Sequence, residues 1–264
     1  MIDLHSHILP GMDDGSDSVQ KSLQMLSIYA DEGFNTVAAT HHFNSEDMSV
    51  DDYDKLWHEK FQELQSAAEN EYKNIRIVKG AEVSISPLLP EMKGLRKLCI
   101  NGSRYFLLEL SPYDIPFYTE ELIYRLRLKG FVPIIAHPER NVRIMEKPDL
   151  LRPLAELGAL IQINAGSVAG LFGRKAEKCA KILLTHNMAH IISTDAHSIG
   201  RRSPRIKETV RKLGKWTGPS NIDMMLNRTP EAVINDRFLE VDSPLPYKKH
   251  MLFFFSKRGQ GSRK

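Results

Sequence analysis

Residues 1–40 read MIDLHSHILPGMDDGSDSVQKSLQMLSIYADEGFNTVAAT and predict one complete strand, helix and strand. The apolar runs at residues 2–5 and 36–40 are typical of short buried strands. Between them apolar side chains recur at helical spacing, after a possible cap at Ser16 or Ser18 and before a glycine that is typical of a helix end. Two strands joined by a helix run parallel in one sheet.

The same alternation of strand and helix continues along the chain. Most of the later apolar runs are followed by a stretch with helical periodicity, and this regularity predicts a parallel sheet. Seven such units favour an open or distorted barrel over a flat sheet, so we expect an α/β fold, a distorted TIM-like (β/α)7 barrel. The five further strands are expected at residues 75–78, 105–110, 132–136, 159–164 and 190–194.

Length and composition are consistent with one large domain. The chain has 264 residues, of which 42% are hydrophobic and 26% charged, and α/β barrels commonly occupy about 200 to 250 residues. We expect the barrel to occupy residues 1–242. Residues 243–264 lose periodicity and contain two prolines, so they are predicted to form a separate tail.

The tail holds an uneven share of the charge. Residues 243–264 carry six basic and no acidic side chains, which leaves 30 basic against 33 acidic residues in the body. A nearly neutral body gives no reason to expect nucleic-acid binding. Basic residues that flank aromatic ones can hold a chain end on an anionic membrane, although a solvated or locally packed tail explains the sequence equally well. The residues concerned are Lys248, Lys249, Phe253, Phe254, Phe255, Lys257 and Arg258.

The sequence also indicates the compartment. No apolar run approaches the roughly 18 to 20 residues that cross a membrane, and the N-terminus lacks a basic region followed by an apolar stretch. We therefore expect a cytoplasmic protein, and a membrane contact of the tail would place it peripherally at the inner membrane face. Cys99 and Cys179 are far apart, so neither a disulfide framework nor a cysteine zinc site is expected.

Chemically active side chains fall at the ends of the predicted strands. In parallel α/β barrels the carboxyl ends of the strands form the catalytic face, so these side chains are expected to converge. Residues i and i+2 of a strand share a face, so His5 and His7 can bind one ion together, as can Asp195 and His197. The side chains are His5, His7, His42, Glu82, Glu109, His137, Asp195 and His197.

Each of these residues alone has an ordinary structural explanation, because single buried histidines and carboxylates are often simply hydrogen bonded. Charged groups are nevertheless rarely buried without a partner or a metal, and here six of seven strand ends carry one. We therefore predict a metal site. Nitrogen and carboxylate ligands without thiolate suit manganese, iron or zinc. Of His41 and His42, which are neighbours on a strand, at most one should point inward.

The motif series resembles the polymerase and histidinol phosphatase (PHP) superfamily over about residues 1–235. Within it, the opening residues together with Asp13-Asp14-Gly15 are most similar to the bacterial manganese-dependent protein-tyrosine phosphatases that are encoded with capsular and exopolysaccharide genes. The segments that carry the resemblance are His5-Ser6-His7, Asp13-Asp14-Gly15, Thr40-His41-His42, Gly80-Ala81-Glu82, Leu108-Glu109, Ala136-His137-Pro138-Glu139-Arg140 and Ser193-Thr194-Asp195-Ala196-His197.

This resemblance implies a PHP fold and a site for three manganese ions, with iron or zinc as alternatives. It implies hydrolysis of phosphotyrosine on a membrane-associated bacterial tyrosine kinase and its substrates. The role of Asp14 rests on the resemblance alone, since its loop position otherwise suggests only a turn residue. The implied ligands are His5, His7, Glu82 and Asp195 for the first ion, Glu82, Glu109 and His137 for the second, and Asp14, His42 and His197 for the third.

A cysteine-based tyrosine phosphatase mechanism is excluded for this chain. Such enzymes need Cys-x5-Arg, and here Tyr105 and Thr185 stand six residues after the two cysteines. Arg140 and Arg201 follow the ligand histidines closely enough to fork onto phosphate oxygens, and we predict that both act in catalysis. Arg202 is a close competitor of Arg201, which better matches the Gly-Arg of the family.

Two other functions remain open at the level of sequence. A small-molecule phosphatase of the same superfamily, acting on histidinol phosphate or a nucleotide phosphoester, would need the same metal ligands. A scaffold that keeps the metal cluster and recruits a kinase without turnover is the third possibility, although no position of the family pattern is lost.

Overall fold

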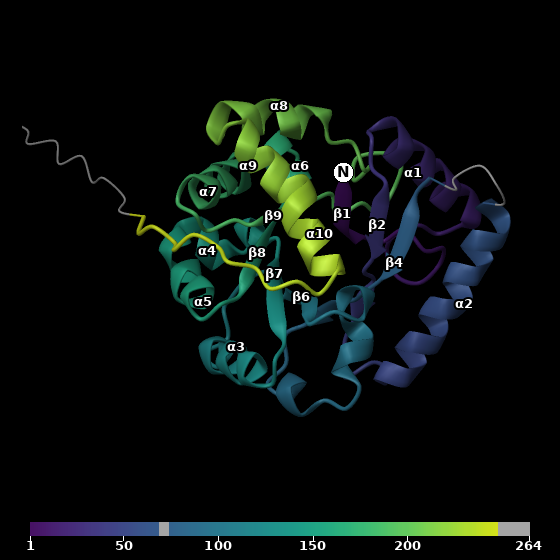
Figure 1. Cartoon of the computed structure of the whole chain (residues 1–264), viewed down its shortest axis with the longest axis horizontal. Coiled ribbons are helices and arrows are strands. Elements are labelled where there is room, and N and C mark those ends of the chain that lie inside the picture. Colours follow the sequence, from purple (N-terminus) through teal and green to yellow (C-terminus); the bar gives the residue numbers. More distant parts are fainter. Residues whose placement is uncertain (69–73, 248–264) are drawn as a thin grey trace, which may run out of the picture.

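The computed structural model describes residues 1–68 and 74–247. Figure 1 shows the strands in the centre of the molecule with helices packed around them. No helix in the described part of the chain is long and apolar enough to span a membrane.

All strand pairs in the described residues are parallel, as the alternation of strands and helices predicts. The pairing gives one sheet in the order β1-β2-β4 and another in the order β3-β5-β6-β7-β8-β9. In chain order the strands are β1 (Ile2–Ser6), β2 (Thr36–Ala39), β3 (His42–Phe43), β4 (Arg76–Lys79), β5 (Glu82–Ser84), β6 (Tyr105–Glu109), β7 (Val132–Ala136), β8 (Leu160–Asn164) and β9 (Ile191–Ser193).

The seven predicted strands are confirmed to within one or two residues at each end, and two of them are divided. Two residues separate β2 from β3 and β4 from β5, so the second and third predicted strands each continue in the other sheet. Backbone bonds cross these breaks, from Gly80 N–H to Ala39 O at 3.2 Å and from Glu82 N–H to His41 O at 2.9 Å. The two sheets therefore form one continuous wall.

The first and last strands also lie side by side. The N–H of His7 donates to Ala196 O and the N–H of Asp195 donates to His5 O, both at 2.9 Å, and Ser6 forms a parallel bridge with Ala196. These bonds return the wall to its beginning, which confirms the predicted distorted barrel.

The helices lie on the outside of this wall. Ser18, one of the two predicted caps, accepts a hydrogen bond from Lys21 N–H at the start of the first helix. The helices are α1 (Val19–Asp31), α2 (Val50–Ala68), α3 (Thr119–Leu128), α4 (Val142–Glu146), α5 (Arg152–Glu156), α6 (Ala165–Ala169), α7 (Arg174–Thr185), α8 (Lys207–Trp216), α9 (Pro219–Asp223) and α10 (Thr229–Ile234).

The alternation of side chains along the strands separates two apolar clusters. In β6, Tyr105 and Leu107 belong to the smaller cluster, which also contains Val233 of α10, whereas Phe106 and Leu108 face the larger cluster against the helices. Since alternate residues share a face, the next residue on the side of Tyr105 and Leu107 is Glu109. The barrel interior is thus apolar along the strands and becomes polar at their carboxyl ends.

The first residues of the predicted tail lie on the body. The N–H of Leu245 donates to His186 O at 2.8 Å, and the N–H of Tyr247 donates to Asp149 Oδ1 at 3.1 Å. Residues 248–264, which contain the basic and aromatic groups of the predicted membrane contact, lie outside the described residues. The division at residue 242 stays a prediction.

Candidate metal centre

Four ligand-type atoms converge where β1 and β9 end beside β5. His5 Nε2 lies 3.2 Å from His7 Nε2 and 3.2 Å from Glu82 Oε2. Asp195 Oδ1 lies 3.5 Å from His5 Nε2 and 3.6 Å from His7 Nε2. Ligands about 2.1 Å from a tetrahedral metal stand roughly 3.4 Å from one another, so these separations suit the coordination shell of one ion.

A second group shares Glu82 with the first. Its Oε1 atom lies 2.7 Å from His137 Nε2, while its Oε2 atom lies 3.1 Å from His42 Nδ1. Glu109 stands beside both histidines, with Oε1 at 3.9 Å from His137 Nε2 and Oε2 at 3.7 Å from His42 Nδ1. Because its two oxygens face different groups, Glu82 has the geometry of a bridging carboxylate.

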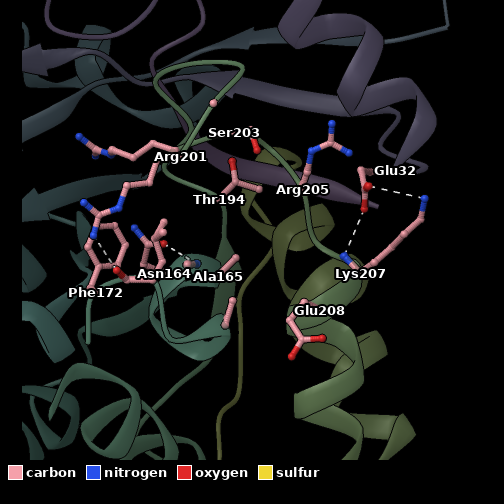
Figure 2. A pocket seen from close by; sticks show the side chains of 15 residues that line it. Glu32, Asn164, Ala165, Phe172, Thr194, Arg201, Ser203, Arg205, Lys207 and Glu208 are labelled. Carbon is pink, nitrogen blue, oxygen red and sulfur yellow. Dashed lines mark hydrogen bonds and ion pairs between the residues drawn. The ribbon is translucent and has the colours of Figure 1, made fainter. Parts of the chain in front are cut away.

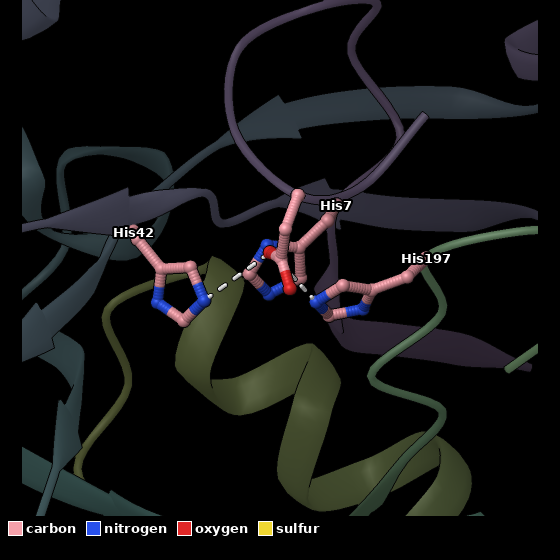
Figure 3. A group of neighbouring side chains, drawn as sticks. His7, His42 and His197 are labelled. Atoms are coloured by element: carbon pink, nitrogen blue, oxygen red, sulfur yellow. Dashed lines mark ion pairs between the residues drawn. The ribbon is translucent and has the colours of Figure 1, made fainter. Parts of the chain in front are cut away.

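A third group lies at the rim of the barrel. Figure 3 shows the rings of His7, His42 and His197 turned toward one another. Asp14 Oδ1 lies 3.5 Å from His42 Nε2 and 3.3 Å from His197 Nε2. The loop residue Asp14, which the strand pattern alone did not select, therefore stands with the histidines.

Several atoms of the cluster are buried without hydrogen-bond partners among the described residues. They include Glu82 Oε2, Asp195 Oδ1 and His197 Nε2. His197 Nδ1 lies 3.0 Å from its nearest acceptor, the Asp195 carbonyl oxygen, so the ring can present the lone pair of Nε2 to the cluster. Buried polar atoms are normally satisfied, and divalent cations would satisfy these.

Charge accumulates in this cluster in a way that favours cation binding. Burial raises the pKa of Glu82, but the surrounding histidines, His5 first among them, lower it by more than burial raises it. The pKa of Glu82 therefore lies well below its usual range. Burial, reinforced by His7, lowers the pKa of His197 to about 2. Glu82 is therefore a carboxylate and His197 a neutral imidazole near neutral pH, the forms that bind metals.

Asp13 holds the histidines from behind. Its carboxylate lies 2.7 Å from His7 Nδ1 and 2.8 Å from His41 Nδ1, and it accepts the backbone N–H of His42 at 3.0 Å. Burial lowers the pKa of His7, but Asp13 and Glu82 outweigh it. A carboxylate behind a metal-binding histidine fixes the ring orientation.

The loop after β1 approaches the strand so closely that one position requires glycine. A Cβ atom on Gly15 would stand 2.3 Å from the carbonyl oxygen of His7, which itself accepts the N–H of Ser16 at 3.0 Å. This approach places Asp13 and Asp14 over the cluster.

The end of β8 supplies amides rather than charges. Gln162 Oε1 lies 3.1 Å from His5 Nδ1 and accepts the N–H of His137 at 3.3 Å, while Asn164 Nδ2 donates to Asp195 Oδ2 at 2.8 Å. An amide at a strand end carries no charge, so the sequence pattern pointed to neither Gln162 nor Asn164.

Two residues of the cluster have unusual backbone conformations. His137 has φ of 33° and Asp195 has φ of 51°. Both angles lie in the left-handed region, which residues other than glycine rarely adopt. Such strain is commonly stored at functional sites.

The arginines near the cluster differ in their contacts. Arg140 Nη1 and Arg202 Nη2 both lie 2.8 Å from Asp195 Oδ2, and the Arg140 guanidinium stands 4.4 Å from the centre of the Phe172 ring. Arg201 is exposed and donates to the carbonyl oxygen of Leu171 at 2.9 Å. The direct contact with the cluster favours Arg202 over its neighbour.

Other histidines and both cysteines have structural surroundings. His41 Nε2 accepts the N–H of Leu9 at 2.9 Å, so of the two neighbouring histidines it is His42 that joins the cluster. Cys99 and Cys179 are buried, and burial raises the pKa of Cys99 to about 12, which is unsuitable for a nucleophile. His58, His186 and His190 bond to backbone groups, and His250 lies outside the described residues.

An α/β barrel with a cluster of histidines and carboxylates at the carboxyl ends of its strands places the chain in the class of proteins that can hold several metal ions at one site. Comparison with known proteins narrows this class. The family model for capsular polysaccharide synthesis, CpsB/CapC, matches residues 1–235. The chain belongs to this family, and the resemblance predicted from the sequence is confirmed.

Relatives of known name cover nearly the whole chain. Tyrosine-protein phosphatase YwqE of Bacillus subtilis is 35% identical over 262 residues, which is 97% of this chain and 100% of the relative. Putative tyrosine-protein phosphatase CapC of Staphylococcus aureus is 37% identical over 257 residues, 96% of this chain and 99% of the relative.

Solved structures agree with the fold. A chain from the crystal structures of YwqE from Bacillus subtilis and CpsB from Streptococcus pneumoniae, described as unique metal-dependent tyrosine phosphatases, gives a TM-score of 0.86 at 32% identity and covers 94% of this chain and 100% of that one. A probable 2-pyrone-4,6-dicarboxylic acid hydrolase from Acinetobacter baumannii gives 0.53 at 14% identity, with 89% and 98% covered, and shares the fold alone.

Proposed function

We propose that this chain is a metal-dependent protein-tyrosine phosphatase. The observation that carries the proposal is a set of buried atoms of Glu82, Asp195 and His197 that have no hydrogen-bond partner among the described residues and lie among other ligand-type atoms, in a chain whose relatives are named tyrosine phosphatases. Neither buried cysteine has the environment of a nucleophile, and we assign the attack on phosphorus to water.

The ligand assignment follows the three groups of the cluster. On the family resemblance we propose three ions, held by His5, His7, Glu82 and Asp195, by Glu82, Glu109 and His137, and by Asp14, His42 and His197. Manganese is proposed over iron or zinc on the family resemblance, since the donor set suits all three. Bound cations supply a water of lowered pKa and stabilise the attacking and departing oxygens of an in-line displacement.

The remaining residues orient the groups. Arg140 is proposed to fork onto the phosphate oxygens, because it reaches the cluster and its guanidinium is held over Phe172. Arg202 also reaches the cluster, because its Nη2 atom lies 2.8 Å from Asp195 Oδ2, and it could bind the phosphate oxygens in the same way. The predicted role of Arg201 rests on the Gly-Arg of the family resemblance, because its guanidinium bonds to the backbone carbonyl of Leu171.

The physiological substrate is proposed to be phosphotyrosine on a bacterial tyrosine kinase and its targets in capsule or exopolysaccharide synthesis. The family description, capsular polysaccharide synthesis, supports this assignment. A cytoplasmic enzyme whose basic tail touches the inner membrane face would meet a membrane-associated kinase there, and this part of the proposal rests on the sequence alone.

The test compares three substrates after removal of metal. The chelated protein is supplied with manganese, iron or zinc, and phosphate release is measured from a phosphotyrosine peptide, histidinol phosphate and a nucleotide. We expect manganese to restore hydrolysis with the phosphopeptide as the preferred substrate, and the Cys99→Ser, Cys179→Ser double variant to keep most of the activity. Preference for either small molecule would favour the alternative phosphatase, and no turnover with any metal would favour a scaffold.

A further inference from the structure

A hollow of about 450 Å³ lies beside the metal centre, and Figure 2 shows the side chains that line it. It shares two residues with that centre, since Asn164 and Arg202 both donate to Asp195 Oδ2 at 2.8 Å. Other lining residues come from the chain that leads into α8. We call this region the basic hollow; its lining includes Asn164, Phe172, Arg201, Arg202, Arg205 and Lys207.

Acidic residues also line the basic hollow, but neither of them pairs with its arginines; Glu32 Oε1 forms an ion pair with Lys207 Nζ at 3.6 Å. Glu32 Oε2 accepts the backbone N–H groups of Ile206 and Lys207, both at 3.1 Å, so this carboxylate caps the start of α8. Glu208 is bound by the guanidinium of Arg211 at 2.6 and 2.8 Å. Neither carboxylate neutralises an arginine of the hollow.

Two guanidinium groups of the hollow have no carboxylate partner in the described part of the chain. Arg205 forms neither a hydrogen bond nor an ion pair with any described residue, and its side chain is exposed. The Arg201 guanidinium donates to the carbonyl oxygen of Leu171 and to no carboxylate of residues 1–68 and 74–247. The next residue, Phe172, also packs against Arg140, so the aromatic wall of the hollow adjoins the arginine proposed to hold the phosphate.

We infer that the basic hollow is a subsite for an acidic side chain of the substrate, an aspartate or glutamate near the phosphotyrosine. The inference rests on the proposed phosphatase function and adds a peptide preference to it. Planar guanidinium groups bind carboxylates through two parallel hydrogen bonds. An exposed pair of this kind changes affinity by about fivefold at most, so the hollow selects among peptides and does not determine whether hydrolysis occurs.

The experiment uses the full-length protein with manganese and two phosphotyrosine peptides that differ only at the two positions on each side of the phosphotyrosine, which are glutamate in one and glutamine in the other. We expect kcat/KM to be about fivefold higher for the glutamate peptide, mainly through a lower KM, with the preference weakened by added salt. Arg205→Gln should reduce this ratio toward one.

The control removes the same charge at the opposite end of the barrel. Arg237 is exposed, and its carbonyl oxygen accepts the hydroxyl of Tyr105 at the start of β6, so Arg237→Gln should keep the preference. Equal rates for the two peptides in the wild type, or a preference that survives Arg205→Gln, would overturn the subsite while leaving the phosphatase function intact. Failure of the wild type to hydrolyse either peptide would overturn both.

Discussion

Asp3 and Asp195 are two aspartates buried in the same barrel, and their surroundings differ. Asp3 Oδ1 accepts the backbone N–H groups of His5 and Thr194 at 3.2 and 3.0 Å, and Oδ2 accepts the hydroxyls of Tyr29, at 2.8 Å, and Thr194. Every lone-pair region of Asp3 thus meets a donor from the protein. Burial raises the pKa of this carboxyl.

Asp195 is satisfied on one side only. Its Oδ2 atom receives Arg140, Arg202 and Asn164, whereas its Oδ1 atom has no hydrogen-bond partner among the described residues and faces histidine nitrogens. Burial raises its pKa, but the histidines, with His5 first, outweigh burial and lower it. Burial of a carboxylate therefore does not identify a ligand; an open oxygen that faces other ligand-type atoms does.

The sharpest test of this comparison replaces one carboxylate oxygen of each aspartate by an amide nitrogen. Asp195→Asn should lower kcat by about 10³-fold or more, because even residues behind metal ligands change affinity or activity by about 10- to 100-fold. Asp3→Asn should instead lower the unfolding free energy by about 1 to 3 kcal/mol, since an amide cannot accept from four donors.

Metal content by mass spectrometry and denaturant unfolding decide this exchange. Loss of metal in a folded Asp195→Asn protein, with metal retained in folded Asp3→Asn, is the expected pair of results. If Asp3→Asn loses metal as completely as Asp195→Asn does, the distinction between satisfied and open carboxylates is wrong.

A second test separates metal binding from substrate binding beside Asp195. Arg140→Lys keeps a positive charge but loses the fork, so kcat should fall by about 10² to 10³ while bound manganese stays near wild type. His137→Ala should lose metal, and Arg143→Lys, an exposed change three residues further on, should have no effect. Loss of metal from Arg140→Lys equal to that from His137→Ala would make Arg140 a structural support of the site.

Much of this arrangement could be predicted from the sequence, because strand periodicity and strand-end position are local properties. The seven strands can be located in this way, and so can the eight strand-end side chains that the structure brings together; their role as metal ligands stays a proposal. The breaks at residues 40–41 and 80–81 cannot, since they depend on where neighbouring strands pair.

Residues that contact the ligand-type side chains from a loop or a turn are harder to predict from the sequence. Asp13 appeared only as part of a resemblance, because its role depends on a loop that folds back over His7. The choice between Arg201 and Arg202 depends on a turn in which the N–H groups of His197 and Ser198 both donate to Arg202 O, at 2.9 and 3.1 Å. The spacing of apolar residues does not predict a turn of this kind.

The third test concerns the carboxylate that orients two histidines. Asp13→Asn should weaken manganese binding by about 10- to 100-fold, because the neutral amide no longer fixes the ring of His7. Titration of the chelated protein with manganese measures the affinity, and excess manganese should restore most of the activity. Asp17→Asn, an exposed change in the same loop region, is the matched control. Wild-type affinity in Asp13→Asn would show that His7 is held by other contacts.

The last test concerns His190, a buried histidine whose ring nitrogen has a hydrogen-bond partner. His190 Nδ1 accepts the N–H of Ile161 at 3.0 Å, and burial lowers the pKa of His190 to about 4 from an ordinary value of 6.5. Between these values the unfolded chain binds a proton that the folded chain does not, so stability falls as pH falls. The contribution is about 2 kcal/mol between pH 7 and pH 5.

Denaturant unfolding at several pH values measures this contribution. His190→Asn keeps an acceptor near the position of Nδ1 and cannot be protonated, so its unfolding free energy should decline less between pH 7 and pH 5 than that of the wild type. An equal decline in the two proteins would mean that His190 is protonated in the folded state.

Anomalous diffraction from crystals grown with manganese tests the central claim most directly. The account predicts three anomalous peaks at the carboxyl ends of the strands, one beside His5 and His7, one beside Glu109 and His137, and one beside Asp14 and His197. Data collected above and below the manganese absorption edge identify the element. Absence of peaks in this cluster from a protein that hydrolyses phosphotyrosine, or peaks located elsewhere, would contradict it.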